Sequence, residues 1–402
     1  MSARRFILLA IAFAVAAIAI GRAGVEADLF EIPLTETLEQ KVGDWFIVAA
    51  APAAEEQDQR IAVVLIGDEA LLDYPYRSPI NRRLLAEVVR LIDAAEPAAI
   101  GIDIVFDRRT ADDAQLLEAI ENAKAPVVLG VLDERLLKNR QSIELQAEFI
   151  DRAGRPFGHL LFEHEPGTLA TTVDRNVRRI ASAEESGSLL PIAEAAPCAA
   201  ENGKLRPFTD VLLCATGRTA PPWNRLIGWS KRPLSGAERF AELELPQHDP
   251  ADLTPVRELL GSDYMGELLA GRIILIGGAM NDSDLHQTPF TVTDGRLVRG
   301  VLIHAEALAQ RLDGREIAEL DRNVAWALAS ALAAICIVIA YRFGLKPRGL
   351  VYSFIGLLLI GILGIVTLRY GDLALPTLAL ATAWVGGAAF GLGARRVTRQ
   401  LP

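Results

Sequence analysis

Acidic and histidine side chains follow several apolar runs that the sequence predicts to be buried β-strands. They are Asp68, Glu69, Asp103, Asp107, Asn281, Asp282, Asp284, His286 and His304. Ligands of open parallel sheets bind outside the carboxyl ends of the strands, so we expect these residues at one edge of a domain. Carboxylates and imidazoles gathered there could bind a divalent cation or a cationic solute. The structural alternative is that they cap helices, form turns and carry solvated charge.

No motif of an established catalytic chemistry accompanies these side chains. Gly277 and Gly278 follow a predicted strand, yet the chain has no G-x-G-x-x-G, Walker A lysine, H-E-x-x-H or G-x-S-x-G. His286 and His304 are candidate metal ligands, although a histidine is more often hydrogen-bonded within a structure. We therefore expect a protein that is not an enzyme and needs no cofactor, and the sequence leaves the question of a metal open.

The elements that must position these residues alternate between strands and helices. The predicted strands are the apolar runs 61–66, 98–106, 127–131 and 272–277. Ser78 is the expected N-cap of a helix with Pro79 at its first position, Thr110 the expected cap of a second, and 301–312 a closing helix. This order predicts an α/β domain with a doubly wound, mostly parallel sheet, whereas the stretch 132–259 shows no clear pattern.

Charge divides the chain into an acidic middle and basic, apolar ends. The net charge is −10 and the pI about 5.2, which argues against nucleic-acid binding. Before residue 22 and after residue 323 there are nine basic residues and one acidic residue, whereas 22–323 holds 32 basic and 50 acidic residues. We therefore expect an acidic soluble domain joined to a membrane part.

Four apolar segments are candidate membrane spans. They are 6–21, 324–341, 349–368 and 373–393. The last three approach the ~20 residues that a spanning helix needs. The first is short and is either an uncleaved anchor, which we favour, or the apolar part of a signal peptide.

Positive charges orient these spans. The basic residues flanking them on the inner side would be Arg4, Arg5, Arg342, Lys346, Arg348, Arg395, Arg396 and Arg399. The predicted organisation is a membrane anchor at 1–24, an extracytoplasmic domain at 25–320, three transmembrane helices at 321–394 and a cytoplasmic tail at 395–402. Both termini would be cytoplasmic. In a bacterium, such a protein would cross the inner membrane several times with residues 25–320 in the periplasm or outside the cell.

Cysteine positions fit an oxidising compartment. Cys198 and Cys214 fall in the outer domain with 15 residues between them, and Cys336 falls in a span. A bridge across such a loop would stabilise by ~3 kcal/mol, and we expect it, the alternative being two unpaired core thiols.

Two of the predicted spans contain small residues four positions apart, a pattern that allows two helices to pack closely. The pairs are Ala327 with Ala331 and Gly387 with Gly391. They allow packing within the chain, which we favour, or against a partner, including a second copy of the chain in a homo-oligomer.

Five sequence motifs together resemble the type-2 CHASE domain, an extracellular sensory module found with cyclases and histidine kinases. They are IAVVLIGDEALL at 61–72, EPAAIGIDIVFD at 96–107, DDAQLLEAI at 112–120, LLAGRIILIGGAMNDSDLHQTPF at 268–290 and GVLIHAEAL at 300–308. The segment LEQKVGDW at 38–45 and three closely spaced spans after the domain also fit. The resemblance covers most of residues 38–394, and the section 133–259 departs from it most.

A second arginine-rich segment and the C-terminal tail are interpreted through this resemblance. Arg175, Arg178 and Arg179 in DRNVRRI could hold an anion, but a solvated strand edge is favoured, and the family has a recurring Asp-then-Arg turn there. Resembling proteins carry an output domain after the third C-terminal span, whereas about nine residues follow Gly393 here. We therefore expect a stand-alone form that signals through a separate output protein, the alternative being a sensor that has lost its output domain.

The resulting functional hypothesis is a membrane-anchored extracytoplasmic sensor of an unknown small molecule or protein, acting in signal transduction. The first alternative is a structural or accessory envelope subunit. The second is a metal-dependent envelope hydrolase that uses the Asp and His loops, which lacks a recognisable nucleophile or base.

Overall fold

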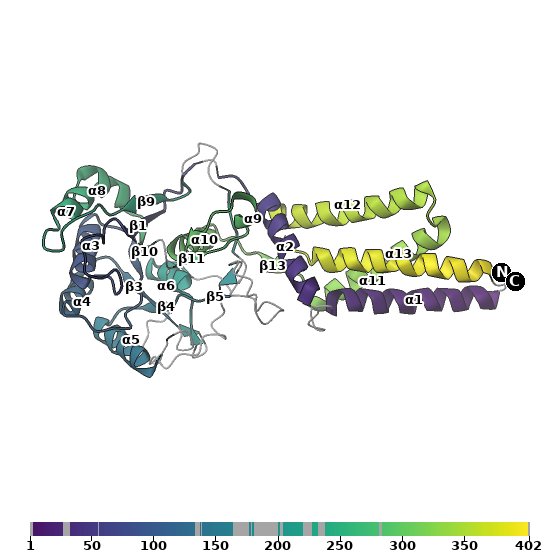
Figure 1. The fold of residues 1–402 in the computed structure, drawn as a ribbon, viewed down its shortest axis with the longest axis horizontal. Helices are drawn as coiled ribbons and strands as arrows, with labels where there is room; N and C mark the ends of the chain where they lie inside the picture. Colours follow the sequence, from purple (N-terminus) through teal and green to yellow (C-terminus); the bar gives the residue numbers. More distant parts are fainter. Residues whose placement is uncertain are drawn as a thin grey trace. The chain divides into compact units, whose positions relative to one another are not determined.

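The computed structural model describes residues 3–26, 33–54, 56–132, 137, 139–163, 177, 179–180, 200–201, 204–219, 227–231, 238–280 and 284–400. They form two compact units, whose elements are labelled in Figure 1. The helical unit comprises the described residues up to Ala51 and from Ile317 onward. The sheet unit comprises the described residues between Pro52 and Glu316.

A six-stranded sheet forms the centre of the sheet unit. Its strand order is β4-β3-β2-β10-β1-β9, and each pairing between neighbours is parallel. The strands are β1 (Ile61–Gly67), β2 (Ala99–Asp103), β3 (Val127–Val131), β4 (Phe157–His159), β9 (Ala241–Glu244) and β10 (Ile273–Ala279). Runs of Val, Ile and Leu that are buried on both faces form β1, β3 and β10, as expected for parallel strands covered by helices. The predicted parallel α/β sheet is confirmed.

Helices cover both faces of this sheet (Figure 1). One face packs against α3 (Arg82–Ala94), α4 (Asp113–Asn122), α5 (Arg140–Ala153), α7 (Thr254–Leu260) and α8 (Asp263–Leu269). The other face packs against α6 (Phe208–Ala215) and α10 (Gly300–Leu312). Alternation along β1 divides its side chains between these two cores, because Ala62 and Val64 join the first and Ile61 and Val63 the second.

The starts of α3 and α4 differ from the sequence predictions. Asn81, not Ser78, caps α3, and its side chain accepts a hydrogen bond from the Leu84 N–H at 3.0 Å. The prediction at Ser78 was wrong because Ser78 and Pro79 lie in the bend before the helix, which begins only at Arg82. At α4 the Thr110 hydroxyl donates to Asp113 Oδ1 at 2.8 Å, and the Thr110 N–H donates to Oδ2 at 3.0 Å. Thr110 therefore organises the approach to α4, whose first residue is Asp113.

Shorter elements complete the described part of the sheet unit. The two-stranded pairs are β5 (Phe162–Glu163) with β6 (Arg179–Ile180), β7 (Ala200–Glu201) with β8 (Lys204–Leu205), and β11 (Leu285–His286) with β12 (Val298–Arg299). Each pair is antiparallel. The short helix α9 (Thr291–Asp294) connects β11 to β12.

The helical unit contains three helices that are long and apolar enough to cross a membrane. They are α11 (Arg322–Phe343), α12 (Pro347–Tyr370) and α13 (Thr377–Gln400). They contain the spans predicted at 324–341 and 349–368 and most of that predicted at 373–393. The last begins later than predicted because Leu373–Ala374 is a strand, β14, paired with β13 (Ala318–Glu319).

The N-terminal helix α1 (Ala3–Glu26) is less clear as a span. Its apolar stretch, Leu9–Val25, is shorter than the other three. It packs along α11 and α13, whereas α2 (Pro33–Ala50) contacts α12 and α13 (Figure 1). Membrane association of α11, α12 and α13 is thus supported by length and composition, and the fourth span stays a proposal.

Small residues allow α11 and α13 to approach closely. A Cβ added to Gly387 would lie 2.6 Å from the Ala333 carbonyl oxygen, and one added to Gly391 would lie 2.5 Å from that of Ile337. The predicted glycine pair therefore faces α11 of the same chain. Ala327 and Ala331 lie on the exposed side of α11, whereas Ala329 and Ala333 are buried. A partner contact through Ala327 and Ala331 stays a prediction.

Candidate functional site

Asp103 lies at the carboxyl end of β2, on the face of the sheet that α6 and α10 cover. Along β2, Gly101 shares this orientation, because a Cβ on Gly101 would meet Leu212 and Phe208 of α6 at 2.8 Å. Asp103 is largely buried. Burial raises the pKa of its carboxyl well above the usual range, and the negative charge of Asp284 nearby raises it further. Two predicted residues from distant parts of the sequence thus come together.

Asp284 lies between this strand end and the start of α10. Its backbone has a positive φ of 59°, a conformation that Asp tolerates better than most residues. The Gly300 N–H donates to the Asp284 carbonyl oxygen at 3.1 Å, and Asp284 Oδ1 would lie 2.6 Å from a Cβ on Gly300. Only glycine at the first position of α10 lets the carboxylate lie this close. The carboxylate also contacts His286, whose Nε2 is 3.0 Å from Oδ1.

His304 lies on α10 between two phenylalanines. Its side chain is buried, and its ring stacks on Phe162 with centroids 4.6 Å apart and meets the edge of Phe208 at 5.5 Å. Its Nδ1 is buried and has no hydrogen-bond partner among the residues that the structure describes. Burial lowers the pKa of His304 to about 3, and His159 and His286 lower it further through like charge. The ring is therefore neutral at physiological pH.

His159 is a member of this cluster that the sequence analysis missed. It is the last residue of β4 and is fully buried, and its Nδ1 accepts a hydrogen bond from the Leu161 N–H at 3.3 Å. It belongs to a stretch in which the sequence shows no clear pattern, because β4 has only three residues. The cluster of Asp103, His159, Asp284, His286 and His304 is called the carboxyl-end cluster below.

Other predicted site residues lie elsewhere. Asp68 forms an ion pair with Arg77, with Oδ1 2.7 Å from Nη1, and Glu69 is exposed. The negative charge of Asp107 attracts the buried guanidinium of Arg82, which also contacts Asp113 of α4. Its loop therefore turns toward the α3 and α4 face of the sheet.

Several predictions fall on residues outside the described ranges. These residues are Arg175, Arg178, Cys198, Asn281 and Asp282. The bridge between Cys198 and Cys214 stays a prediction, and Cys336 is a free, buried thiol. Arg179 belongs to β6, in keeping with a place on a short strand.

A metal site finds no support in the described part of the chain. Among those residues, no three or more His, Cys, Asp or Glu side chains are grouped so that they could hold a metal ion. In the carboxyl-end cluster His159 and His304 are buried, whereas the Asp284 side chain is 46% exposed.

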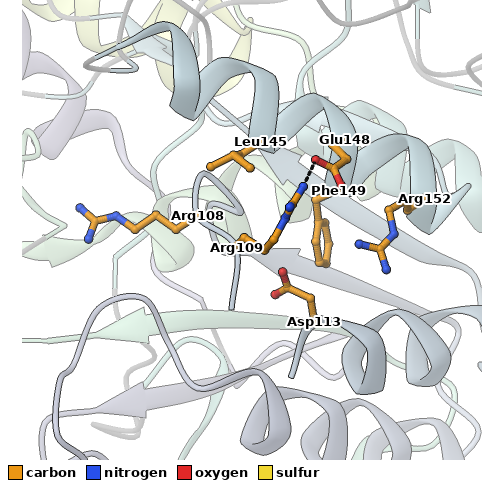
Figure 2. Close-up of a pocket in the computed structure, with 7 residues that line it drawn as sticks. All are labelled: Arg108, Arg109, Asp113, Leu145, Glu148, Phe149 and Arg152. Atoms are coloured by element: carbon orange, nitrogen blue, oxygen red, sulfur yellow. Dashed lines mark hydrogen bonds and ion pairs between the residues drawn. The ribbon is translucent and has the colours of Figure 1, made fainter. Parts of the chain in front are cut away.

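A small pocket between the loop after β2 and α5 is a second candidate site (Figure 2). Its lining residues are Arg108, Arg109, Asp113, Leu145, Glu148, Phe149 and Arg152. In Figure 2 Arg109 is paired with Glu148, at 2.5 Å, whereas Arg108 points away from the other side chains. Asp113, on its floor, is bonded to Thr110 and Arg82. Both acids of the lining are therefore already paired, Glu148 with Arg109 and Asp113 with the buried Arg82.

A family model described as the CHASE2 domain matches residues 12–345, which is most of the chain. No curated protein and no solved structure matches it.

Proposed function

The chain belongs to the CHASE2 domain family of sensory domains, and from this membership we propose that it is an extracytoplasmic sensor anchored in the membrane. The match over residues 12–345 is the observation that carries the proposal. It includes the whole sheet unit and α11. Three apolar helices that could cross a membrane support the anchoring.

We further propose that the sensor passes its signal through these helices to a separate protein. Backbone hydrogen bonds between β13 and β14 support this step. The Ala318 N–H donates to the Asp372 carbonyl oxygen at 2.7 Å, and the Leu320 N–H donates to that of Ala374 at 3.2 Å. The segment entering α11 is therefore tied to the connection between α12 and α13. A displacement of that segment would move the ends of all three helices together.

The exposed side of α12 is the surface on which a partner helix would be expected. Phe354, Leu358 and Leu359 are each more than half exposed there. Lipid covers such a surface where no partner does, so the two must be separated by experiment.

Photocrosslinking in native membranes tests the proposal. A photoreactive phenylalanine analogue would replace Phe354 or Ala331, both exposed, and Ala329, fully buried against neighbouring helices, would be the control. We expect a protein adduct from an exposed position that changes between resting and stimulated cells, and none from position 329. An adduct that never changes would favour the accessory subunit, and lipid adducts alone at every position would contradict signalling in trans.

A metal-dependent hydrolase is not supported by the described residues. They hold no group of ligands suited to a metal ion. His304 is the second most buried histidine of the carboxyl-end cluster, after His159. Its low pKa makes it a poor general base at neutral pH.

A further inference from the structure

Within the described part of the chain, the surroundings of His304 offer its buried Nδ1 no hydrogen-bond partner. Phe162 of β5 covers one face of the ring, and Phe208 of α6 meets it edge-on. The side chain is almost wholly buried. A buried polar atom without a partner costs free energy, so its retention calls for an explanation.

Two titratable groups act on His304, namely His159 at the end of β4 and His286 on β11. The carboxyls of the cluster lie one step further away, because Asp284 contacts His286 and Asp103 interacts with Asp284. The charged side chains further along α10 are already paired. Glu306 pairs with Arg239 at 2.7 Å, and Arg311 with Asp210 at 3.1 Å. Glu306 also responds to pH, because burial raises its pKa to about 7, but its protonation as the pH falls favours the folded state and therefore opposes opening.

We propose that the carboxyl-end cluster is a proton-binding site, and that acidification outside the cytoplasm opens the cover that Phe162 and Phe208 form over His304. The inference rests on the proposed function, because a sensor can respond to external pH only if its sheet unit lies outside. The ligand is the proton itself. The bound state is one in which the His304 ring reaches water and carries a charge.

The direction of the effect follows from the environment of the ring. In the closed state a proton on His304 would be held between two aromatic rings, out of water, and positive charge on His159 or His286 would repel it. The folded-state pKa of about 3 lies below the ordinary value of 6.5, so protonation favours any conformation that hydrates the ring. This effect begins as the pH falls below about 6.5. Between pH 7.5 and pH 5, His304 by itself should shift the opening equilibrium roughly 30-fold toward the open state.

Asp103 acts in the opposite direction. Its pKa is raised in the closed state, so the closed state takes up a proton there as the pH falls. Removing the titration of His304 alone should therefore abolish or reverse the opening, which distinguishes the histidine from the carboxyl.

Hydrogen exchange on the full chain in lipid nanodiscs tests the proposal. Backbone exchange at 157–163 and 300–308 would be measured at pH 7.5 and pH 5 and corrected for the intrinsic rate. We expect opening to rise in the unmodified chain, and the change in opening between the two pH values to be roughly 30 times more favourable there than in His304→Phe, which keeps an aromatic ring but cannot take up a proton. His248→Gln is the matched control. His248 is also buried, but it is bonded to Tyr74, which belongs to the core on the opposite face of the sheet. This variant should respond as the unmodified chain does.

A second readout keeps the test decisive if His304→Phe does not fold. Exchange of the imidazole C2 hydrogen in the unmodified chain gives the pKa of each histidine separately. We expect the pKa of His304 to lie well below the ordinary value of 6.5. A His304 that titrates near 6.5 with unchanged backbone exchange at pH 5 would overturn the proton site. That result would leave the sensor assignment intact, whereas a sheet unit found on the cytoplasmic side would remove the proposed function itself.

Discussion

Buried ionisable side chains on α10 show how a single residue can make stability depend on pH. Glu306 accepts a hydrogen bond from the Ser230 N–H at 2.6 Å and pairs with Arg239 at 2.7 Å. Burial raises the pKa of Glu306 to about 7, although the positive charge of Arg239 lowers it. Because the folded-state pKa exceeds the unfolded value of 4.5, this residue contributes stability that is lost as the pH rises from 4.5 through about 7.

Arg239→Met should therefore be more harmful at high pH than at low pH. The variant leaves Glu306 buried without its partner, at a cost of about 3 kcal/mol when the carboxyl is ionised. At pH 5 the protonated carboxyl needs no partner, and the loss should fall to about 1 kcal/mol. Chemical denaturation at pH 5 and pH 8 measures both values. The double variant Arg239→Met with Glu306→Gln is the control and should lose the pH dependence; an equal loss at both pH values in the single variant would contradict the argument.

Residue types predicted part of the candidate site and not all of it. The rule about strand ends brought Asp103 and Asp284 to one place, and they do interact. The rule failed for Asp68, which forms an ion pair with Arg77. It does not specify toward which face of the sheet a side chain points once its strand has ended. His159 was missed because its strand is too short to leave a periodic signal.

At the scale of elements, close backbone contacts decide where the cluster lies. Gly158 of β4 lies against the start of α6, so that an added Cβ would be 2.6 Å from the Phe208 Cα and 2.7 Å from its N. This contact places Phe208 next to the strand end that carries His159. The central strands could be predicted since their runs of Val, Ile and Leu are long. The position of α6 could not, because it depends on a contact between residues about fifty apart in a stretch without a clear pattern.

Gly158→Ala should loosen this contact. Backbone atoms cannot move aside as a flexible side chain can, so we expect a loss of about 2 kcal/mol in the free energy of unfolding. Gly266→Ala in α8 is the matched control, since no atom lies within 4 Å of its added Cβ and its φ is negative. The control should be neutral or gain up to about 1 kcal/mol, as alanine favours a helix. Equal effects of the two changes on denaturation would show that the β4 and α6 contact is not tight.

At the scale of the whole molecule, the division of charge along the chain argues for the orientation in the membrane. The middle of the chain, 22–323, is strongly acidic, whereas the flanks carry nine basic residues and one acidic residue. The connection between α11 and α12 holds Lys346, and Arg342 and Arg348 lie at the adjoining helix ends. The connection between α12 and α13 contains Asp372, next to Arg369 at the end of α12. Short basic connections stay in the cytoplasm, so the first of these should be inside and the second outside.

Reporter fusions test this orientation directly. A reporter that works only in the cytoplasm should be active after Pro402 and inactive when inserted at Gly217, an exposed turn after α6 in the sheet unit. A reporter that works only outside should give the reverse pattern. Replacing Arg342, Lys346 and Arg348 together by Gln should weaken the preference, because these charges hold the connection between α11 and α12 inside. Changing Arg315, which precedes the spans on the opposite side, to Gln should leave the pattern unchanged. Cytoplasmic activity at Gly217 in the unmodified chain would contradict the orientation, and with it the premise that the carboxyl-end cluster meets the pH outside the cell.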